Sequence, residues 1–340
     1  MAQRYGIAAA GNWIIDQVKI VDRYPEEEHL AIILEESMGT GGAAYNTLMG
    51  LRALDPDLIL QAVGVVGEDP NGERIFAHLK QVDISTTLMR KTTEAPTSYT
   101  DVMTVKQTGR RTFYHNRGAN ALLCGEDIEF DQIHARMFHL GYLMLLDALD
   151  APDPANENRP CAARVLEEAQ AEGIKTSLDM VTDLSPRLHA IVAPVLPHID
   201  YFIANELEAA ALTHIPLRGP KNELLRDKLP DVARELFRMG VASLVCIHMP
   251  EGGYWLDASG AGLFKPSLNV PQDFIKGTAG AGDAFCAGLL YGLHENWNAD
   301  RCLTLAVAHA AQSLSDATTT AGLKSMADTM ALVERFGFRS

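Results

Sequence analysis

Short apolar runs alternate with helical patterns along most of the chain. Six of these runs are continuous, as buried strands are, and they cover residues 5–10, 59–66, 137–145, 174–180, 200–204 and 241–247. Between them, apolar residues recur at helical spacing, for example at Leu48, Leu51 and Leu54. The helices expected over 161–172 and 228–239 each end at a glycine. Strands that alternate with helices predict an α/β fold, a doubly wound, mostly parallel sheet with helices on both faces.

Two stretches of the chain do not follow this rhythm. Their β-like segments come in pairs joined by a polar turn and cover 13–20, 30–35, 98–105 and 111–116. We therefore expect a small antiparallel sheet, set apart from the main one and formed by segments 13–37 and 96–117. No internal repeat or long linker interrupts the sequence, so we interpret residues 1–340 as one domain.

Composition narrows the range of functions. Of 340 residues, 47% are hydrophobic and 21% are charged, which is typical of a globular protein. The net charge of −15 disfavours a role on nucleic acid or on an anionic membrane surface. The sequence shows neither a membrane span nor a signal peptide. Five scattered cysteines without a Cys-x-x-Cys pair indicate a reduced, cytoplasmic protein.

The sharpest local motif is a glycine-rich segment, 277–288, that leads into an apolar helix. Glycines at a helix N-terminus leave backbone N–H groups free to bind an anion such as a phosphoryl oxygen. Asp283 follows in the first helical turn, where a carboxylate suits a general base that takes a proton from an attacking hydroxyl. This combination favours phosphoryl transfer. The alternative is a tight turn whose aspartate only complements the helix dipole.

Five segments, in order along the chain, resemble motifs of the ribokinase-like (PfkB) carbohydrate kinases. They are 41–46 (Gly-Gly-Ala-Ala-Tyr-Asn), 64–72 (Gly-Val-Val-Gly-Glu-Asp-Pro-Asn-Gly), 118–120 (Gly-Ala-Asn), 205–208 (Asn-Glu-Leu-Glu) and 280–283 (Gly-Ala-Gly-Asp). Each motif alone is weak, but together they cover roughly residues 5–325. The resemblance implies a ribokinase-like fold in which the small sheet is a lid and a homodimer contact.

The resemblance also implies a reaction in which a sugar or nucleoside hydroxyl attacks the γ-phosphoryl group of ATP. Asp283 would be the base, with Gly280, Ala281 and Gly282 as the anion hole. The substrate would be held by polar groups, by glycines and by an arginine, namely Asn12, Asp16, Gly41, Gly42, Asn46 and Arg117. The nucleotide would contact Asn205, His248, Gly253, Thr278 and His309. Glu208 would order Mg²⁺ through its water shell.

Three features depart from the family pattern. Gly277 stands where many members carry an aspartate that helps to coordinate a monovalent cation, so activation by K⁺ is doubtful. In the nucleotide segment, Pro250 replaces a glycine and His248 a threonine. Proline removes a backbone donor, which His248 would replace. Ala43 and Gly141 stand where ribokinases proper carry Lys and Glu, which enlarges the pocket.

We expect the chain to be an ATP-dependent kinase that phosphorylates a primary hydroxyl of a sugar or sugar-like molecule. The larger pocket favours a hexose, a keto-sugar acid or a nucleoside over ribose. Arg117 would bind a carboxylate or phosphate on the substrate, unless it pairs with a surface acid. Two alternatives are a nucleoside kinase, with Tyr45, Tyr114 or Tyr142 stacking on the base, and a non-catalytic sugar-binding protein on the same scaffold.

Overall fold

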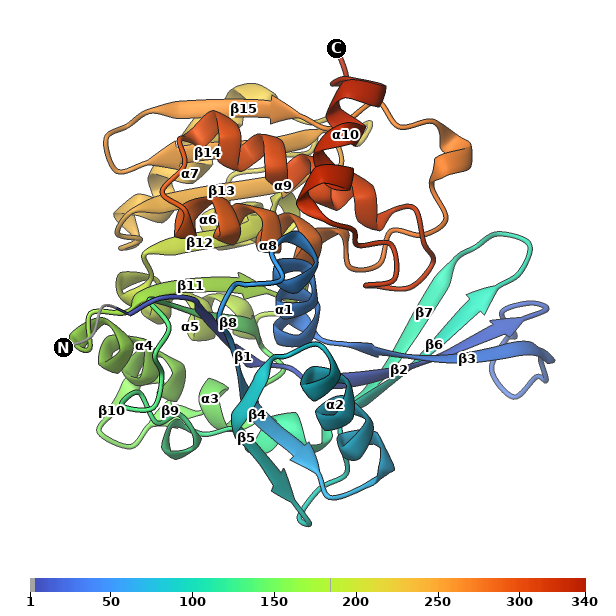
Figure 1. Ribbon diagram of the computed structural model, residues 1–340. Helices are drawn as coiled ribbons and strands as arrows, with labels where there is room; N and C mark the ends of the chain where they lie inside the picture. Colours follow the sequence, from blue (N-terminus) through green and yellow to red (C-terminus); the bar gives the residue numbers. More distant parts are fainter. Residues whose placement is uncertain (1–3, 184) are drawn as a thin grey trace.

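The computed structural model describes residues 4–183 and 185–340, and its centre is a nine-stranded sheet (Figure 1). The strand order is β15-β14-β13-β12-β11-β8-β1-β4-β5. The strands are β1 (Ile7–Gly11), β4 (Leu60–Gly67), β5 (Ser85–Thr92), β8 (Met137–Leu143), β11 (Lys175–Met180), β12 (Tyr201–Asn205), β13 (Leu244–Met249), β14 (Gly252–Asp257) and β15 (Gly262–Pro266). The first seven of these run parallel, while β14 and β15 add antiparallel pairings at one edge. The predicted mostly parallel sheet is confirmed.

Helices cover both faces of this sheet. They are α1 (Ala43–Leu54), α2 (Pro70–Gln81), α3 (Asp147–Asp150), α4 (Cys161–Ala171), α5 (Arg187–Val192), α6 (Glu206–Thr213), α7 (Leu229–Arg238), α8 (Ala281–His294), α9 (Ala299–Ser313) and α10 (Met326–Phe336). Strand β1 divides its side chains between two cores. Ile7 and Ala9 pack with α1, α2, α8 and α9, whereas Ala8 and Ala10 pack with α4 to α7. A strand buried on both faces explains the continuous apolar run of its sequence. No helix in the described part of the chain has the length and apolar character needed to cross a membrane.

The β-rich stretches form a second sheet with the order β3-β2-β6-β7. Its strands are β2 (Ile14–Val21), β3 (Ile33–Gly41), β6 (Tyr99–Val105) and β7 (Arg111–Asn116). The outer pairs are antiparallel, as expected, but the central pair β2–β6 is parallel. The chain passes through α1, β4, α2 and β5 between β3 and β6, so β6 arrives as a crossover connection and not as a hairpin.

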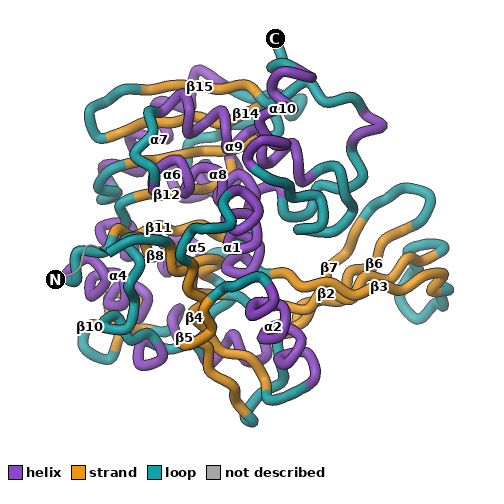
Figure 2. The backbone as a smooth tube through the Cα atoms, in the orientation of Figure 1, coloured by secondary structure: helices purple, strands orange, loops and turns teal. Residues whose placement is uncertain are grey.

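The two sheets meet where the parallel strands end. Strand β2 begins three residues after β1, and α1 begins two residues after β3. Figure 2 shows the small sheet extending from the helices of the main body as strands and turns alone. In an open α/β sheet, ligands bind at the carboxyl ends of the strands. The site is therefore expected between this edge, the N-termini of α1 and α8, and the small sheet.

Candidate active site

The glycine-rich segment forms a sharp turn into α8. Gly280 is the residue before the helix and has a φ of 78°, in the left-handed region that favours glycine. A Cβ atom at this position would also lie 2.6 Å from the carbonyl oxygen of Thr319. The first N–H groups of α8, from Ala281 to Asp283, have no carbonyl of the same helix to bind. Ala281 and Gly282 among them belong to the anion hole that the resemblance implies.

Asp283 lies in the first turn of α8 with only 4% of its surface exposed. Its two carboxylate oxygens accept hydrogen bonds from different elements. Asn46 of α1 donates its Nδ2–H to Oδ2 at 2.7 Å, and Tyr142 of β8 donates its hydroxyl to Oδ1 at 2.8 Å. Burial raises the pKa of Asp283 to about 6, and the two hydrogen bonds act against this rise.

Asn12 and Asp16 approach the glycine pair that precedes α1. A Cβ atom at Gly41 would overlap Oδ2 of Asp16, and one at Gly42 would overlap the carbonyl oxygen of Asn12. Neither amide atom of the Asn12 side chain has a hydrogen-bond partner among the described residues, although both are buried. A buried amide without partners is costly, and the hydroxyl groups of a bound sugar would satisfy it.

Asp16 lies close enough to Asp283 for the two charges to interact. Burial, followed by the negative charge of Asp283, raises the pKa of Asp16 to about 6, whereas the guanidinium of Arg111 acts in the opposite direction. Through Asp16 and Asn46, the structure thus brings the predicted substrate residues together around the predicted base.

Two further carboxylates are buried near the base, and only one of them, Glu208, has a role predicted from the sequence. The charges of both Asp283 and Glu208 act on the other, Asp179. Asp179 is the penultimate residue of β11 and accepts a hydrogen bond from the backbone N–H of Tyr142 at 3.3 Å. Burial raises the pKa of Asp179 well above its ordinary value, and the charges of Asp283 and Glu208 add to the rise. The sequence feature that could have predicted a role for Asp179 is its position near the end of a buried strand, because ligands bind at the carboxyl ends of the strands in such sheets.

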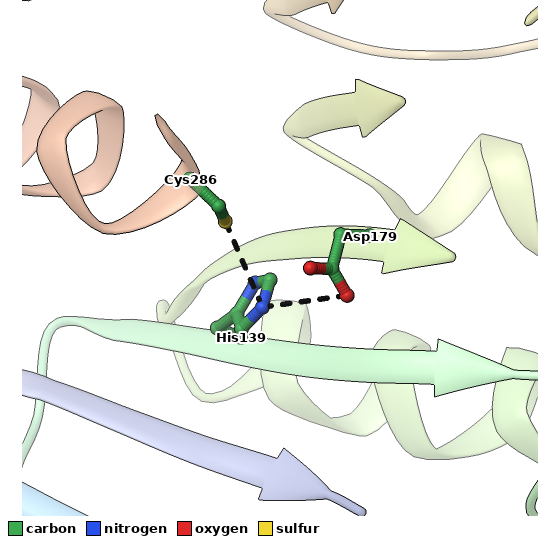
Figure 3. Close-up of side chains that lie close together, drawn as sticks. All are labelled: His139, Asp179 and Cys286. Carbon is green, nitrogen blue, oxygen red and sulfur yellow. Dashed lines mark hydrogen bonds and ion pairs between the residues drawn. The ribbon is translucent and has the colours of Figure 1, made fainter. Parts of the chain in front are cut away.

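A buried histidine, His139, lies between Asp179 and the buried thiol of Cys286, as Figure 3 shows. The Nε2 atom of His139 lies 3.7 Å from Oδ1 of Asp179 and 3.8 Å from Sγ of Cys286. The other ring nitrogen, Nδ1, lies 3.0 Å from the hydroxyl of Ser177. Burial lowers the pKa of His139 to about 3, so the ring is neutral at pH 7. Cys286 lies one helical turn after Asp283, which places this cluster directly behind the predicted base.

Asn205 and Glu208 form a capping box at the start of α6. The Asn205 side chain accepts hydrogen bonds from the N–H groups of Leu207 and Glu208. The Glu208 carboxylate accepts three hydrogen bonds, two from Asn205 and one from the Thr182 hydroxyl. Burial raises the pKa of Glu208 to about 7, and the Asn205 and Thr182 donors oppose the rise. The two residues therefore cap the start of α6, which by itself accounts for an asparagine followed three residues later by a glutamate.

His248 and Gly253, assigned to the nucleotide, lie opposite each other on β13 and β14. The His248 ring packs against Phe285 with 5.2 Å between centroids, and a Cβ atom at Gly282 would lie 3.2 Å from its Cε1. His248 therefore adjoins the glycine turn of α8. Burial lowers the pKa of His248 to about 4, so its ring is neutral at pH 7. A Cβ atom at Gly253 would lie 2.7 Å from Phe285, so close packing against α8 requires glycine there.

Thr278 and Gly277 lie in the turn itself. The carbonyl of Thr278 accepts a hydrogen bond from the N–H of Ala281 at 3.4 Å. A Cβ atom at Gly277 would lie 3.1 Å from the carbonyl oxygens of both Asp316 and Ala317. An aspartate at this position would therefore require the loop around residue 317 to move.

Two predicted contact residues have other neighbours in the structure, and their roles stay predictions. His309 is fully buried, and its Nε2 would lie 3.1 Å from a Cβ atom on Gly50, so its ring packs against α1. Arg117 forms an ion pair with Asp147, which was the alternative for this residue. The cation that acts on Asp16 is Arg111 of β7, whose Nη2–H also donates to the carbonyl of Ala317 at 3.4 Å.

Comparison with known proteins agrees with this geometry. Residues 6–326 match the pfkB family carbohydrate kinase. A probable chloroplastic fructokinase of Arabidopsis thaliana is 29% identical over 259 residues, 74% of this chain and 61% of that protein. The ATP-dependent ribose-1-phosphate kinase of Halopiger xanaduensis is 27% identical over 84% of this chain and 83% of that protein.

Solved structures show the same fold. The ribokinase of Arabidopsis thaliana, in complex with ribose and ATP, aligns with a TM-score of 0.78 at 19% identity, over 97% of this chain and 99% of that one. The family match spans nearly the whole chain and includes all of the segments that build the site. The chain therefore belongs to the pfkB family of carbohydrate kinases and is an ATP-dependent kinase.

Proposed function

We propose that this kinase transfers the γ-phosphoryl group of ATP to a primary hydroxyl of a sugar or sugar-like molecule, with Asp283 as the general base. The observation that carries the proposal is the placement of Asp283. It is buried in the first turn of α8, directly after a left-handed glycine, and Asn46 of another helix holds its carboxylate.

The proposed reaction uses groups of this chain at both ends of the transferred phosphoryl group. The acceptor hydroxyl loses its proton to the Asp283 carboxylate, and its oxygen forms a bond to the γ-phosphorus while the bond to the β-phosphate oxygen breaks. Each carboxylate oxygen has two acceptor sites, so the bonds from Asn46 and Tyr142 leave room for the substrate hydroxyl. The N–H groups of Ala281, Gly282 and Asp283 stabilise the negative charge on the phosphoryl oxygens.

ATP and Mg²⁺ are the proposed cofactors. When bound, Mg²⁺ would neutralise phosphate charge. The Glu208 carboxylate has four acceptor sites, and three of them are used by Asn205 and Thr182. The remaining site fits a water molecule of the metal's shell and not a close direct ligand, which suits a cation that keeps most of its water. His248, beside the glycine turn, is the proposed donor to a nucleotide phosphate. Because Gly277 lacks a carboxylate, we propose that K⁺ does not activate the enzyme.

The charges around the site favour a neutral sugar over a sugar acid or phosphosugar. Burial and then the negative charge of Asp283 already raise the pKa of Asp16, and a negative charge on the substrate would raise it further. Arg117, the residue expected to bind an anion, is paired with Asp147. Of these two arginines, only Arg111 would then be available to neutralise the charge of an anionic substrate.

The tyrosines offered for a nucleoside base have other contacts. Tyr45 is fully buried and its hydroxyl bonds to His78, while the hydroxyl of Tyr114 bonds to Tyr24 on the small sheet. Tyr142 donates to Asp283. The geometry therefore supports a sugar better than a nucleoside.

We also propose a homodimer formed through the small sheet. Large apolar side chains are exposed on its strands β3 and β7, namely Ile33, Leu34, Met38 and Phe113. They lie on the two edge strands of the sheet, and exposed large apolar side chains are typical of a surface that is covered by a partner.

The proposal is tested by measuring ADP release from ATP·Mg²⁺ with hexoses, pentoses, sugar acids, phosphosugars and nucleosides, with and without K⁺. We expect turnover of a neutral sugar that is lost by at least 100-fold in Asp283→Asn. The matched control is Asp328→Asn, because Asp328 is also the third residue of a helix but is exposed, far from the site in α10. Full activity in Asp283→Asn, or an equal loss in both variants, would contradict the role of Asp283.

A further inference from the structure

Tyr142 stands at an irregularity in the main sheet. In the ladder between β8 and β11, Asp179 pairs with Gly141 and Met180 pairs with Leu143, so Tyr142 is left without a partner. This is a β-bulge, an arrangement that redirects a side chain and is frequent beside active sites. Tyr142 also has a φ of 57°, in the left-handed region that bulky residues rarely adopt. The bulge and the left-handed φ, which is energetically unfavourable for a tyrosine, together redirect the Tyr142 side chain.

The redirected side chain reaches the predicted base. The Tyr142 hydroxyl donates to Oδ1 of Asp283 at 2.8 Å, while its backbone N–H donates to Asp179 at 3.3 Å. Asp179 is in turn bordered by His139, whose Nε2 lies 3.7 Å away (Figure 3). Asp179 therefore holds the backbone of the bulge, and the Tyr142 side chain in turn holds the carboxylate of Asp283.

We infer that Tyr142 is a positioning residue for Asp283: its hydroxyl, aimed by the bulge, holds the carboxylate in the ionised form and in the orientation that receives the substrate proton. A phenol hydroxyl that donates to a carboxylate stabilises its charged form. This inference rests on the proposed function, because it assigns Asp283 the role of base.

The surroundings of Asp283 make such a donor necessary. Asp16 faces it from β2, Asp179 from β11 and the Cys286 thiol from the next turn of α8, and each is acidic or neutral. Asn46 and Tyr142 donate to its two oxygens. In this environment burial favours the protonated carboxyl, which cannot act as a base, and the two donors oppose it. Removing one of the two donors moves the equilibrium toward that inactive form.

The test is the pH profile of Tyr142→Phe, which removes the hydroxyl and keeps the ring in the bulge. A hydrogen bond to a charged group is worth enough to move the acid limb of kcat upward by about one pH unit. With the limb moved from about pH 6 to about pH 7, we expect kcat to fall by about fivefold at pH 6 and about twofold at pH 7, and to recover above pH 8. KM for the sugar should change by less than threefold. Tyr142→3-fluorotyrosine, a stronger donor of similar size, should move the limb downward.

The matched control is Tyr291→Phe. Tyr291 lies on the same helix as Asp283, and its hydroxyl also donates to an aspartate, Asp55, at 3.2 Å, but outside the site. We expect its acid limb to coincide with that of the wild type. Coincident limbs for Tyr142→Phe and the wild type would overturn the inference.

A second measurement separates this inference from the proposed function. The carboxyl of Asp283 can be titrated without substrate by the infrared difference between the wild type and Asp283→Asn. The pKa of Asp283 should be higher in Tyr142→Phe than in the wild type. An unchanged pKa of Asp283 in Tyr142→Phe would refute the role of Tyr142, even if no sugar in the panel is phosphorylated. A raised pKa together with full activity of Asp283→Asn would refute only the role of Asp283 as the base.

Discussion

A methyl group placed at Gly41 should weaken substrate binding without unfolding the protein. A Cβ atom there would overlap Oδ2 of Asp16 and lie 3.1 Å from its Cγ, so the carboxylate must move away. Gly41 is not among the positions with positive φ, so alanine fits the backbone, and replacing glycine by alanine at such a position stabilises by about 0.4–1 kcal/mol.

The displaced carboxylate loses its proposed hydrogen bonds to the sugar. Bonds to a charged group contribute about 1.5–3 kcal/mol, which corresponds to a loss of about 10- to 150-fold in kcat/KM for the sugar. Steady-state kinetics should show this loss mainly in KM, while urea unfolding shows stability equal to or above that of the wild type.

Gly39→Ala is the matched control. Gly39 lies on the same strand and pairs with Asp16 across the ladder, yet a Cβ atom there would meet no described atom within 4 Å. Asp16→Ala should reproduce the loss, and combining it with Gly41→Ala should add little, because both changes remove the same carboxylate. Wild-type KM in Gly41→Ala, equal losses in both glycine variants, or fully additive losses would refute the reasoning.

Two further predictions concern the base and its turn. The pKa values of Asp16 and Asp283 are raised to about 6, and both carboxylates must be ionised to act in the proposed mechanism. We therefore expect kcat/KM to rise as the pH increases from 5 to 7 and to level off above pH 7. A profile that is already flat at pH 5 would contradict this. In Gly280→Ala, the new Cβ atom would lie 2.6 Å from the Thr319 carbonyl oxygen, on a residue whose φ is left-handed. The substitution should therefore lower the free energy of unfolding by about 2–3 kcal/mol and remove activity. Gly260→Ala, with a φ of 84° and open space around it, should cost only about 1 kcal/mol and leave activity intact, as urea unfolding and ADP release would show.

The local parts of the site could be predicted from the sequence because short-range geometry determines them. Gly280 and Asp283 belong to one turn of backbone, and Asn205 and Glu208 to one capping box, so residue type and spacing are sufficient. The main sheet could be predicted for the same reason, because the alternation of strands and helices is visible in the local pattern of the sequence. The parallel pairing of β2 with β6 could not be foreseen, because it depends on the path of the chain between them.

The remaining parts depend on contacts between distant segments. Arg111 and Arg117 are equally basic in the sequence, and only the placement of β7 and of Asp147 decides which one acts on Asp16. The role of Tyr142 depends on a one-residue bulge between β8 and β11, which no pattern in either strand reveals. His309 occurs at helical spacing on an apolar helix, and its burial against α1 follows from how the two helices pack.

The buried carboxylates explain why so much of this chain converges on one place. Asp179, Glu208 and Asp283 are each removed from water, and burial raises the pKa of all three, so each destabilises the folded protein when it is ionised. A domain that only had to fold would replace them with apolar residues. Their donors come from four separate places: the first turn of α1, the bulge in β8, the α6 cap and Thr182 after β11. An arrangement that costs stability and is held from several sides is typical of a site selected for chemistry, and the proposed proton acceptor, Asp283, is one of its three carboxylates.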